Sequence, residues 1–281
     1  MRAWITGAGG LIGNTLVQTA ATHAPAWKPR GLTRVMLDLT DFSATRRLFA
    51  REQPAVVIHC AALSKSPACQ ANPQLAHLLN VEVTRQLVEL AADLPFVFFS
   101  TDLVFDGRRG NYVEGDAVNP LSVYAETKAA AETIVARHPR ALIVRTSLNG
   151  GTSPTGDRGF NEELRRAWQT GRTVKLFTDE FRSPIAAVET ARAVWQLIAV
   201  GATGICHVAG SERLSRWQIG RLLADRWPQL HPRIEPGSLR DYQGAPRPPD
   251  TSLNCARAET LRGAPLPGFT DWLTAHPEEI F

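Results

Sequence analysis

The chain has 281 residues, a formal net charge of +4, and 44% hydrophobic residues. This length suits one large α/β unit with a smaller lobe and leaves ample apolar surface to bury. The arginines are scattered and form no basic run, which argues against a nucleic-acid partner. No apolar run reaches the ~18 residues of a membrane span, and the chain opens on a strand-like segment and not on a signal peptide. We therefore expect a cytoplasmic protein that binds neither nucleic acid nor membrane.

The first segment joins an apolar run to a glycine-rich turn. Ala3-Trp4-Ile5 precedes three glycines that stand three residues apart. Glycine permits positive φ and close approach of backbone N–H groups to a pyrophosphate, and the helix predicted after the turn would point its positive end at the same anion. An ordinary strand–turn–helix is the alternative. The dinucleotide-binding interpretation places Gly7, Gly9, Gly10, Leu11, Ile12 and Gly13 at the cofactor.

The end of the second predicted strand, residues 28–33, indicates which dinucleotide is bound. A carboxylate there would accept hydrogen bonds from the ribose of NAD, whereas arginine favours the 2′-phosphate of NADP. Arg34 follows the strand and is the candidate ligand of the 2′-phosphate, with Arg30 as a possible second contributor. No acid occurs before Asp38, which with Leu39 looks like the end of a third short strand. We therefore predict NADPH, with NADH as the alternative. A solvated surface role for Arg34 is the competing interpretation.

Strands and helices alternate through the rest of the first half. Small side chains at Cys60, Ala61 and Ala62 follow one apolar strand and would let a cofactor lie over its end. Ser100 and Thr101 end the next strand. This alternation predicts a Rossmann-type, doubly wound parallel sheet with ligands at the carboxyl ends of its strands. The predicted elements are strands 55–59, 96–100 and 141–145 and helices 73–92 and 122–137.

The second half returns to the sheet after a turn-rich loop. Residues 149–157 are rich in Gly, Ser and Thr, and residues 235–250 are rich in Pro and Gly. A helix at 187–200 and a strand at 205–208 lie between them. We expect a dinucleotide-binding domain of residues 1–148 and 185–209, and a discontinuous substrate-binding lobe of residues 149–184 and 210–281.

A tyrosine and a lysine stand four residues apart in the predicted helix 122–137. Tyr124 and Lys128 would therefore lie on one helix face. A phenol has a pKa of ~10, and a nearby ammonium can lower that pKa enough for proton transfer. The lysine can also contact the nicotinamide ribose, and Thr101 offers a hydroxyl to polarise a substrate carbonyl. A surface tyrosine with a solvated lysine is the bland alternative, but the position after a strand ending in Ser-Thr favours catalysis.

Metal chemistry is not indicated. Cys60, Cys69, Cys206 and Cys255 lack metal-type spacing, and the seven histidines include no H-E-x-x-H pattern. Buried thiols in a reducing compartment are the better interpretation.

Taken together, these motifs resemble the extended short-chain dehydrogenase/reductase superfamily, and most closely its dTDP-4-dehydrorhamnose reductase-like branch. The resemblance covers nearly the whole chain. It rests on Thr6-Gly7-x-x-Gly10-x-x-Gly13, Asp38–Asp41, His59–Ala62, Asn80-Val81, Ser100–Gly107, Asn119–Tyr124 with Lys128, Arg145–Ser147, Asp179–Pro184, Arg247-Pro248 and Ser252-Leu253.

The resemblance implies an NADPH-dependent reductase of a nucleotide-linked 4-keto sugar. Thr101, Tyr124 and Lys128 would be its catalytic trio, with Tyr124 as proton donor. Asn80, Ser100, Tyr124 and Lys128 would also contact the cofactor. Thr101, Asp102, Leu103, Leu148 and Arg182 would contact the substrate, Arg182 through its diphosphate. A local ion pair of Arg182 with Asp179 or Glu180 is the alternative, and a homodimer is compatible with this interpretation.

Two positions depart from the branch. Leu103 stands where it usually has an aromatic residue, and Leu148 where it usually has tryptophan, so the sugar can differ from 4-keto-rhamnose. Two other functions stay open: a sugar-nucleotide epimerase or dehydratase, and a non-catalytic NADP-binding regulatory subunit. Dehydratases usually have Glu at the position of Leu103, which argues against that class. The intact catalytic trio argues against a regulatory subunit.

Overall fold

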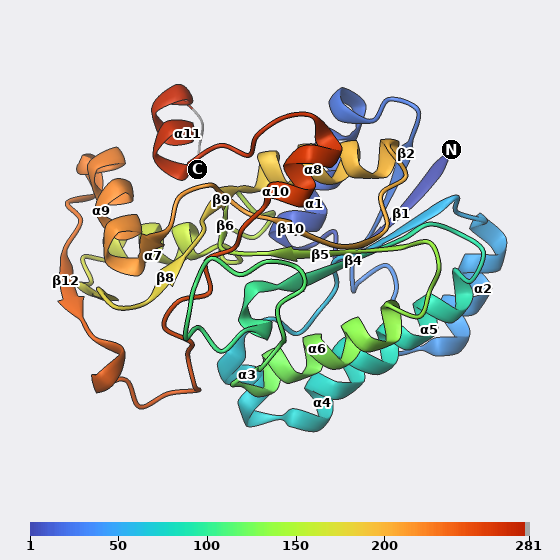
Figure 1. The fold of residues 1–281 in the computed structure, drawn as a ribbon, viewed down its shortest axis with the longest axis horizontal. Coiled ribbons are helices and arrows are strands. Elements are labelled where there is room, and N and C mark those ends of the chain that lie inside the picture. Colours follow the sequence, from blue (N-terminus) through green and yellow to red (C-terminus); the bar gives the residue numbers. More distant parts are fainter. Residues whose placement is uncertain (279–281) are drawn as a thin grey trace.

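The computed structural model describes residues 1–278, and its centre is a six-stranded parallel sheet (Figure 1). The strand order β10-β5-β4-β3-β1-β2 places sequence-distant strands side by side, which confirms the predicted Rossmann-type doubly wound fold. The strands are β1 (Arg2–Thr6), β2 (Lys28–Leu32), β3 (Val56–His59), β4 (Phe96–Thr101), β5 (Ala141–Thr146) and β10 (Gly204–Val208).

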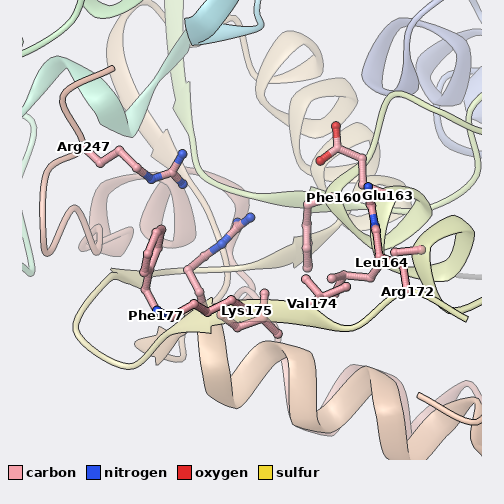
Figure 2. Close-up of a pocket in the computed structure, with 11 residues that line it drawn as sticks. Phe160, Glu163, Leu164, Arg172, Val174, Lys175, Phe177 and Arg247 are labelled. Atoms are coloured by element: carbon pink, nitrogen blue, oxygen red, sulfur yellow. The ribbon is translucent and has the colours of Figure 1, made fainter. Parts of the chain in front are cut away.

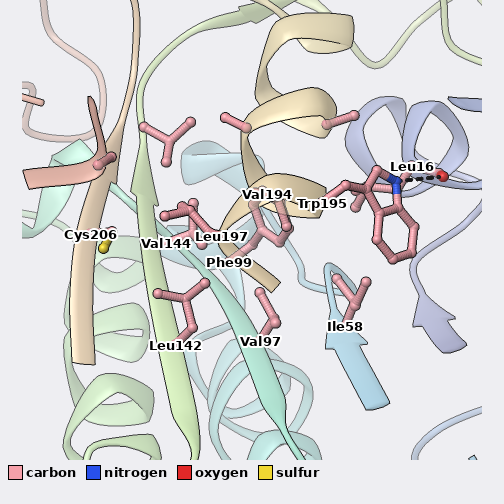
Figure 3. Close-up of a cluster of buried hydrophobic side chains, with 14 of the residues drawn as sticks. Leu16, Ile58, Val97, Phe99, Leu142, Val144, Val194, Trp195, Leu197 and Cys206 are labelled. Carbon is pink, nitrogen blue, oxygen red and sulfur yellow. Dashed lines mark hydrogen bonds between the residues drawn. The ribbon is translucent and has the colours of Figure 1, made fainter. Parts of the chain in front are cut away.

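Helices cover both faces of this sheet. One face carries α1 (Leu11–His23), α8 (Ala187–Ala199) and α10 (Ala256–Arg262), and the other carries α2 (Phe42–Glu52), α5 (Val83–Leu90) and α6 (Val123–Val135) (Figure 1). The apolar cluster between the sheet and α1, α8 and α10 is the first core, and the cluster on the opposite face is the second core. Side chains alternate along each strand, so Phe96 and Phe98 of β4 pack in the second core and Val97 and Phe99 pack in the first. In the first core, Trp195 Nε1 donates to the Leu16 carbonyl at 3.3 Å (Figure 3).

The helix predicted over residues 73–92 is present but is not uniform. It consists of α4 (Pro73–His77), a π-helical turn (Leu78–Glu82) and α5. A short helix, α3 (Ser66–Ala71), precedes it. The π-helical turn contains Asn80, which is only 1% exposed. Such turns commonly occur beside functional sites.

The predicted third strand ending at Asp38–Asp41 is wrong, because this segment is a series of turns. Thr40 donates from its backbone N and its hydroxyl to Asp38 Oδ1, at 3.0 and 2.8 Å. Asp41 accepts from Ala44 N and caps α2. Side chains that bind their own backbone in this way compete with strand pairing.

The smaller lobe packs around its own apolar cluster, in which Trp168, Leu223 and Phe269 are buried. Three short strand pairs join its segments: β7 with β12, β8 with β11, and β6 with β9. Its elements are β6 (Asn149–Gly150), α7 (Phe160–Gln169), β7 (Val174–Phe177), β8 (Phe181–Arg182), β9 (Ile185–Ala186), β11 (Leu214–Ser215), α9 (Arg216–Arg226), β12 (Ile234–Gly237) and α11 (Phe269–Ala275). Single 3₁₀ turns occur at Asp102–Val104, Pro228–Leu230 and Leu239–Asp241.

The expected lobe boundary does not hold around α10. We expected all of residues 210–281 to belong to the substrate lobe, but α10 packs against α8 and β10. Cys255, Ala258 and Leu266 are buried in the first core of the sheet. The apolar spacing of this helix completes the cover of that face, so the chain returns to the large domain before it ends.

Candidate active site

The glycine turn sits between β1 and α1 at the carboxyl edge of the sheet. Gly7 has φ +70°, and a Cβ there would lie 2.7 Å from the backbone N of Ala61. A Cβ on Gly13 would overlap the Gly7 carbonyl oxygen, whereas one on Gly9 would meet only Thr33 at 3.9 Å. Gly7 and Gly13 are therefore required by close packing.

The amino terminus of α1 fits a pyrophosphate. Gly10 caps the helix without a side-chain hydrogen bond, and no acidic residue occurs in the first turn. The first N–H groups thus keep their capacity to bind an anion. Ser100 at the end of β4 adds a buried hydroxyl oxygen that has no hydrogen-bond partner within residues 1–278. Both features suit a dinucleotide lying across this edge.

Arg34 lies in the turn after β2, and its side chain is 80% exposed. Its Nε is 3.8 Å from Asp38 Oδ2. The Asp38 carboxylate already accepts two hydrogen bonds from Thr40. The bond from the Thr40 backbone N–H, and to a smaller extent the bond from its hydroxyl, hold the pKa of Asp38 below its usual value. Leu39 packs its side chain against the second core. Of the residues predicted here, Arg34 therefore has the most exposed side chain, since that of Asp38 is 45% exposed.

Asn80 fastens the loop after β3 to α6. Its Oδ1 accepts from Leu63 N at 2.8 Å, and its Nδ2 donates to Leu63 O at 3.1 Å and to Thr127 Oγ1 at 2.9 Å. The same loop begins with Cys60–Ala62, where Ala61 N donates to Thr6 Oγ1. Asn80 thus shapes the cofactor edge with polar atoms that are already engaged by protein groups.

Tyr124 and Lys128 occupy one face of α6, which Ser122 caps. Lys128 is 3% exposed and its Nζ lies 3.8 Å from the centroid of the Phe98 ring. Burial lowers the pKa of Lys128 to about 7, while Glu132 and, less strongly, Cys60 act to raise it. A buried ammonium that titrates near neutrality is typical of functional sites.

The pKa of Tyr124 is raised and not lowered as expected. Burial is the largest cause, and the electrostatic influence of Asp102 and then of Cys69 adds to it, while a hydrogen bond with Thr101 opposes it. Desolvation penalises a phenolate more than the surroundings stabilise it. The phenol therefore keeps its proton at neutral pH, which is the protonation state that a proton donor needs.

Thr101 and Asp102 connect the sheet to the lobe. The Thr101 hydroxyl donates to Asp102 Oδ1 at 3.1 Å and accepts from Leu103 N at 3.2 Å. Asp102 Oδ2 accepts from the hydroxyls of Ser147 and Thr251, both at 2.8 Å. Both oxygens of this buried carboxylate are thus occupied by protein groups.

Arg182 does not face an open cavity. Its side chain is 3% exposed, Nη2 lies 2.8 Å from Glu180 Oε1, and it also donates to the carbonyls of Phe181 and Pro248. The structure therefore supports the local ion pair over a direct diphosphate contact. Leu148 is partly buried and packs against the apolar cluster of the lobe.

A cavity of about 220 Å³ opens in the lobe, with Arg247 and Phe177 at one end and Glu163 and Arg172 at the other (Figure 2). Arg216, the first residue of α9, also lines it. Sequence reasoning assigned no role to Arg216 or Arg247. The Ser215–Gln218 capping box marks Arg216 as the first residue of a helix. This local pattern was the one sequence signal that could have drawn attention to Arg216.

The described residues contain no group of His, Cys, Asp or Glu that could hold a metal ion. All four cysteines are free thiols. Within residues 1–278, no helix combines the length and apolarity that a membrane crossing requires.

Comparison with known proteins decides the family. The model of the RmlD substrate binding domain matches residues 1–280. The chain belongs to this family. It is an NAD(P)-dependent oxidoreductase of the extended short-chain dehydrogenase/reductase superfamily, in the branch of sugar-nucleotide reductases related to dTDP-4-dehydrorhamnose reductases.

Curated relatives match this RmlD-family chain over most of their length. A probable low-salt glycan biosynthesis reductase, Agl14, of Haloferax volcanii is 30% identical over 98% of the chain and 97% of its own length. The dTDP-4-dehydrorhamnose reductase of Mycolicibacterium smegmatis is 31% identical over 99% of the chain and 85% of its own length. The methionine adenosyltransferase 2 subunit beta of Xenopus laevis is 26% identical over 92% of the chain and 82% of its own length.

Solved structures of the family share the fold. A dTDP-4-dehydrorhamnose reductase of Clostridium acetobutylicum superimposes with a TM-score of 0.88 at 25% identity, covering 98% of both chains. The Bacillus anthracis enzyme of that name, solved with NADP, has the same TM-score at 24% identity, covering 98% of this chain and 97% of that one.

Proposed function

We propose that the protein is an NADPH-dependent reductase of a 4-keto deoxysugar nucleotide, with Tyr124 as the proton donor. The observation that carries this proposal is a site in two parts. Thr101 ends β4 at the same carboxyl edge of the sheet that carries the glycine turn after β1, and Tyr124 and Lys128 share one face of α6, which contacts β4. A cavity with three arginines and two aromatic side chains, Phe160 and Phe177, opens in the lobe that contacts that edge.

The residues present fit a dinucleotide. The free N–H groups of α1, the tight turn at Gly7 and the unpaired Ser100 hydroxyl would hold its phosphates and nicotinamide side. NADPH, when bound, supplies a hydride to the substrate carbonyl. We assign the 2′-phosphate to Arg34, because Asp38 is engaged by Thr40.

The protein residues then handle the proton and the oxygen. Tyr124, protonated at neutral pH, would donate its proton to the substrate oxygen as negative charge develops there. Lys128 would orient the ribose and stabilise the phenolate that results. Thr101, now bonded to Asp102, would orient the substrate beside the phenol.

The cavity in the lobe suits the nucleotide diphosphate. Arg216 and Arg247 supply cationic donors for phosphate oxygens, and Phe160 and Phe177 supply apolar surface for a base. A nucleotide sugar would use both parts of such a site, with its nucleotide diphosphate in the cavity and its keto sugar at the catalytic residues. Two relatives bear the names of reductases of this kind.

Asp102 helps to separate this proposal from a dehydratase. A general acid for elimination needs a carboxyl group presented to the substrate, whereas Asp102 is 4% exposed and accepts bonds from three hydroxyls. The other alternative is a regulatory subunit, and relatives named methionine adenosyltransferase 2 subunit beta are among the matches. A non-catalytic subunit would not need Thr101, Tyr124 and Lys128.

The test is a turnover screen of dTDP- and UDP-linked 4-keto sugars with NADPH and NADH. We expect oxidation of NADPH with at least one of them. Arg216→Gln should then raise KM for the sugar nucleotide by about 10-fold or more, as expected for a lost charged hydrogen bond. No turnover with any substrate, together with tight NADP binding, would favour the regulatory alternative.

A further inference from the structure

A continuous chain of charged side chains runs from the cavity to the catalytic edge of the sheet. Arg247 donates from Nε and Nη2 to the two oxygens of Glu180 at 2.9 and 2.7 Å. Arg182 reaches Glu180 through Nη2 at 2.8 Å and Asp102 through Nε at 3.8 Å. Asp102 in turn accepts the hydrogen bond from Thr101. The cavity and the catalytic threonine are therefore joined without a gap.

The middle of this chain is buried. Glu180 is 0% exposed, Arg182 3% and Asp102 4%, whereas the Arg247 side chain is 31% exposed where it lines the cavity. Burial alone would raise the pKa of Glu180, but Arg182, Arg247 and Arg216 outweigh it and lower that pKa. Glu180 is thus a buried anion shared between cations, and charge interactions are strong in such surroundings.

We propose that Glu180 is a positioning residue that couples occupancy of the cavity to the geometry of Asp102 and Thr101. This coupling rests on the proposed function. It identifies Glu180 as the residue through which a bound diphosphate affects the catalytic residues. A diphosphate in the cavity competes with Glu180 for Arg247. Glu180, relieved of Arg247, holds Arg182 more firmly and draws it away from Asp102.

The consequence reaches the proton donor. The groups that face Tyr124 are Asp102 and Cys69, with the Thr101 hydroxyl beside it and Lys128 one helical turn away. When Arg182 withdraws from Asp102, the Asp102 carboxylate is less neutralised and holds the Thr101 hydroxyl more firmly through their hydrogen bond. Substrate binding thereby fixes Thr101 in place to orient the substrate oxygen beside Tyr124.

Glu180→Gln tests this coupling, because the amide keeps the shape and removes the charge. Arg247 then turns to the cavity and Arg182 pairs fully with Asp102. We expect KM for the sugar nucleotide and kcat to fall together, each by about 10-fold. A purely structural role would not produce this joint decrease. Calorimetry with dTDP as the probe should show tighter binding by a similar factor.

A matched control is Arg213→Gln. Arg213 forms an ion pair with Asp250 at 2.6 Å and lies over the Phe181 ring, but within residues 1–278 it forms no ion pair with Glu180 or Asp102. It should leave dTDP affinity and kcat unchanged.

Asp102→Asn tests the same coupling by changing the partner of Arg182 on the catalytic side. It replaces Glu180→Gln as the test if that variant does not fold. It releases Arg182 to Glu180 and so frees Arg247. Because coupling between sites is reciprocal, dTDP should bind several-fold more tightly although Asp102 does not line the cavity. The double variant should bind dTDP no more tightly than the stronger single variant.

Unchanged dTDP affinity in both variants overturns the proposal, as does a higher KM with unchanged kcat in Glu180→Gln. If the wild-type protein reduces no nucleotide-linked 4-keto sugar, the proposed function fails. The dTDP measurements still decide the coupling in that case. Absence of dTDP binding to the wild type overturns both.

Discussion

Asn80 donates to the hydroxyl of Thr127 at 2.9 Å, and this hydroxyl donates to the carbonyl of Tyr124 at 2.7 Å. The side chain that fixes the loop after β3 therefore also fixes the first turn of α6, where Tyr124 lies. Thr127 and Asn80 are both buried. The loop after β3 and the helical turn that carries Tyr124, the proposed proton donor, are thus parts of one hydrogen-bonded unit.

Thr127→Val should loosen this unit. It leaves the Asn80 amide with only the Leu63 carbonyl as acceptor, at a cost of about 1–2 kcal/mol in unfolding free energy. We expect a lower kcat as well, since Tyr124 loses part of its support. Thr133→Val on the same helix is the control, because its exposed hydroxyl only donates to Ala129 O. Similar effects of both changes on kcat would contradict this role.

Tyr124→Phe should lower kcat by about 10²–10⁴-fold, because it removes the proton donor and little else. NADPH affinity, measured by fluorescence titration, should be retained. Tyr112→Phe is the control, since that phenol donates to Asp106 Oδ1 at 2.8 Å and lies outside the proposed site. Near-normal turnover in Tyr124→Phe would show that the trio is misassigned.

Lys128→Met should stabilise the unliganded protein at neutral pH. The folded pKa is lowered to about 7 from an ordinary 10.5, so the unfolded chain binds more protons between these values. The contribution of Lys128 to the free energy of unfolding of the wild type therefore rises with pH between pH 7 and 10.5 and is lowest below pH 7. Denaturant unfolding should show the variant more stable by on the order of 2–4 kcal/mol at pH 6.5, with little difference near pH 10.5. An equal difference at both pH values would refute the shift.

Arg34→Ala should weaken NADPH binding by about 1–3 kcal/mol and leave NADH binding nearly unchanged. Arg30→Ala is a matched control on β2, because Arg30 pairs with Glu52 at 3.3 Å. Isothermal titration with both cofactors measures the selectivity. Parallel losses for NADPH and NADH would remove Arg34 from the 2′-phosphate site.

Gly13→Ala should destabilise the protein by about 1–3 kcal/mol and impair cofactor binding, because the new Cβ meets the backbone of Gly7. Gly9→Ala should be tolerated, since only Thr33 lies within ordinary contact distance. Thermal unfolding of the two variants gives the comparison. Equal melting temperatures would mean that α1 can move away from the turn.

The features that sequence could predict are those with a local cause. Glycine spacing follows from backbone contacts within one turn, and a tyrosine and lysine four residues apart must share a helix face. The burial of Arg182 was not accessible in this way, because its partners Asp102 and Pro248 come from distant segments. The sign of the Tyr124 pKa shift likewise depended on burial by surrounding segments. The missing third strand depended on Thr40 binding Asp38, a local signal that the apolar pattern concealed.

The π-helical turn at Leu78–Glu82 determines which face of the following helix, α5, is turned toward the sheet. Each residue advances an α-helix by about 100°, so the extra residue lets Asn80 face the site while Val83 and Leu87 still face the sheet. Loss of one residue here would turn either the amide or the apolar stripe of α5 away from its partners. This segment should therefore accept substitutions at its exposed position Leu78 but no single insertion or deletion, which makes its length as much a determinant of the active site as its side chains.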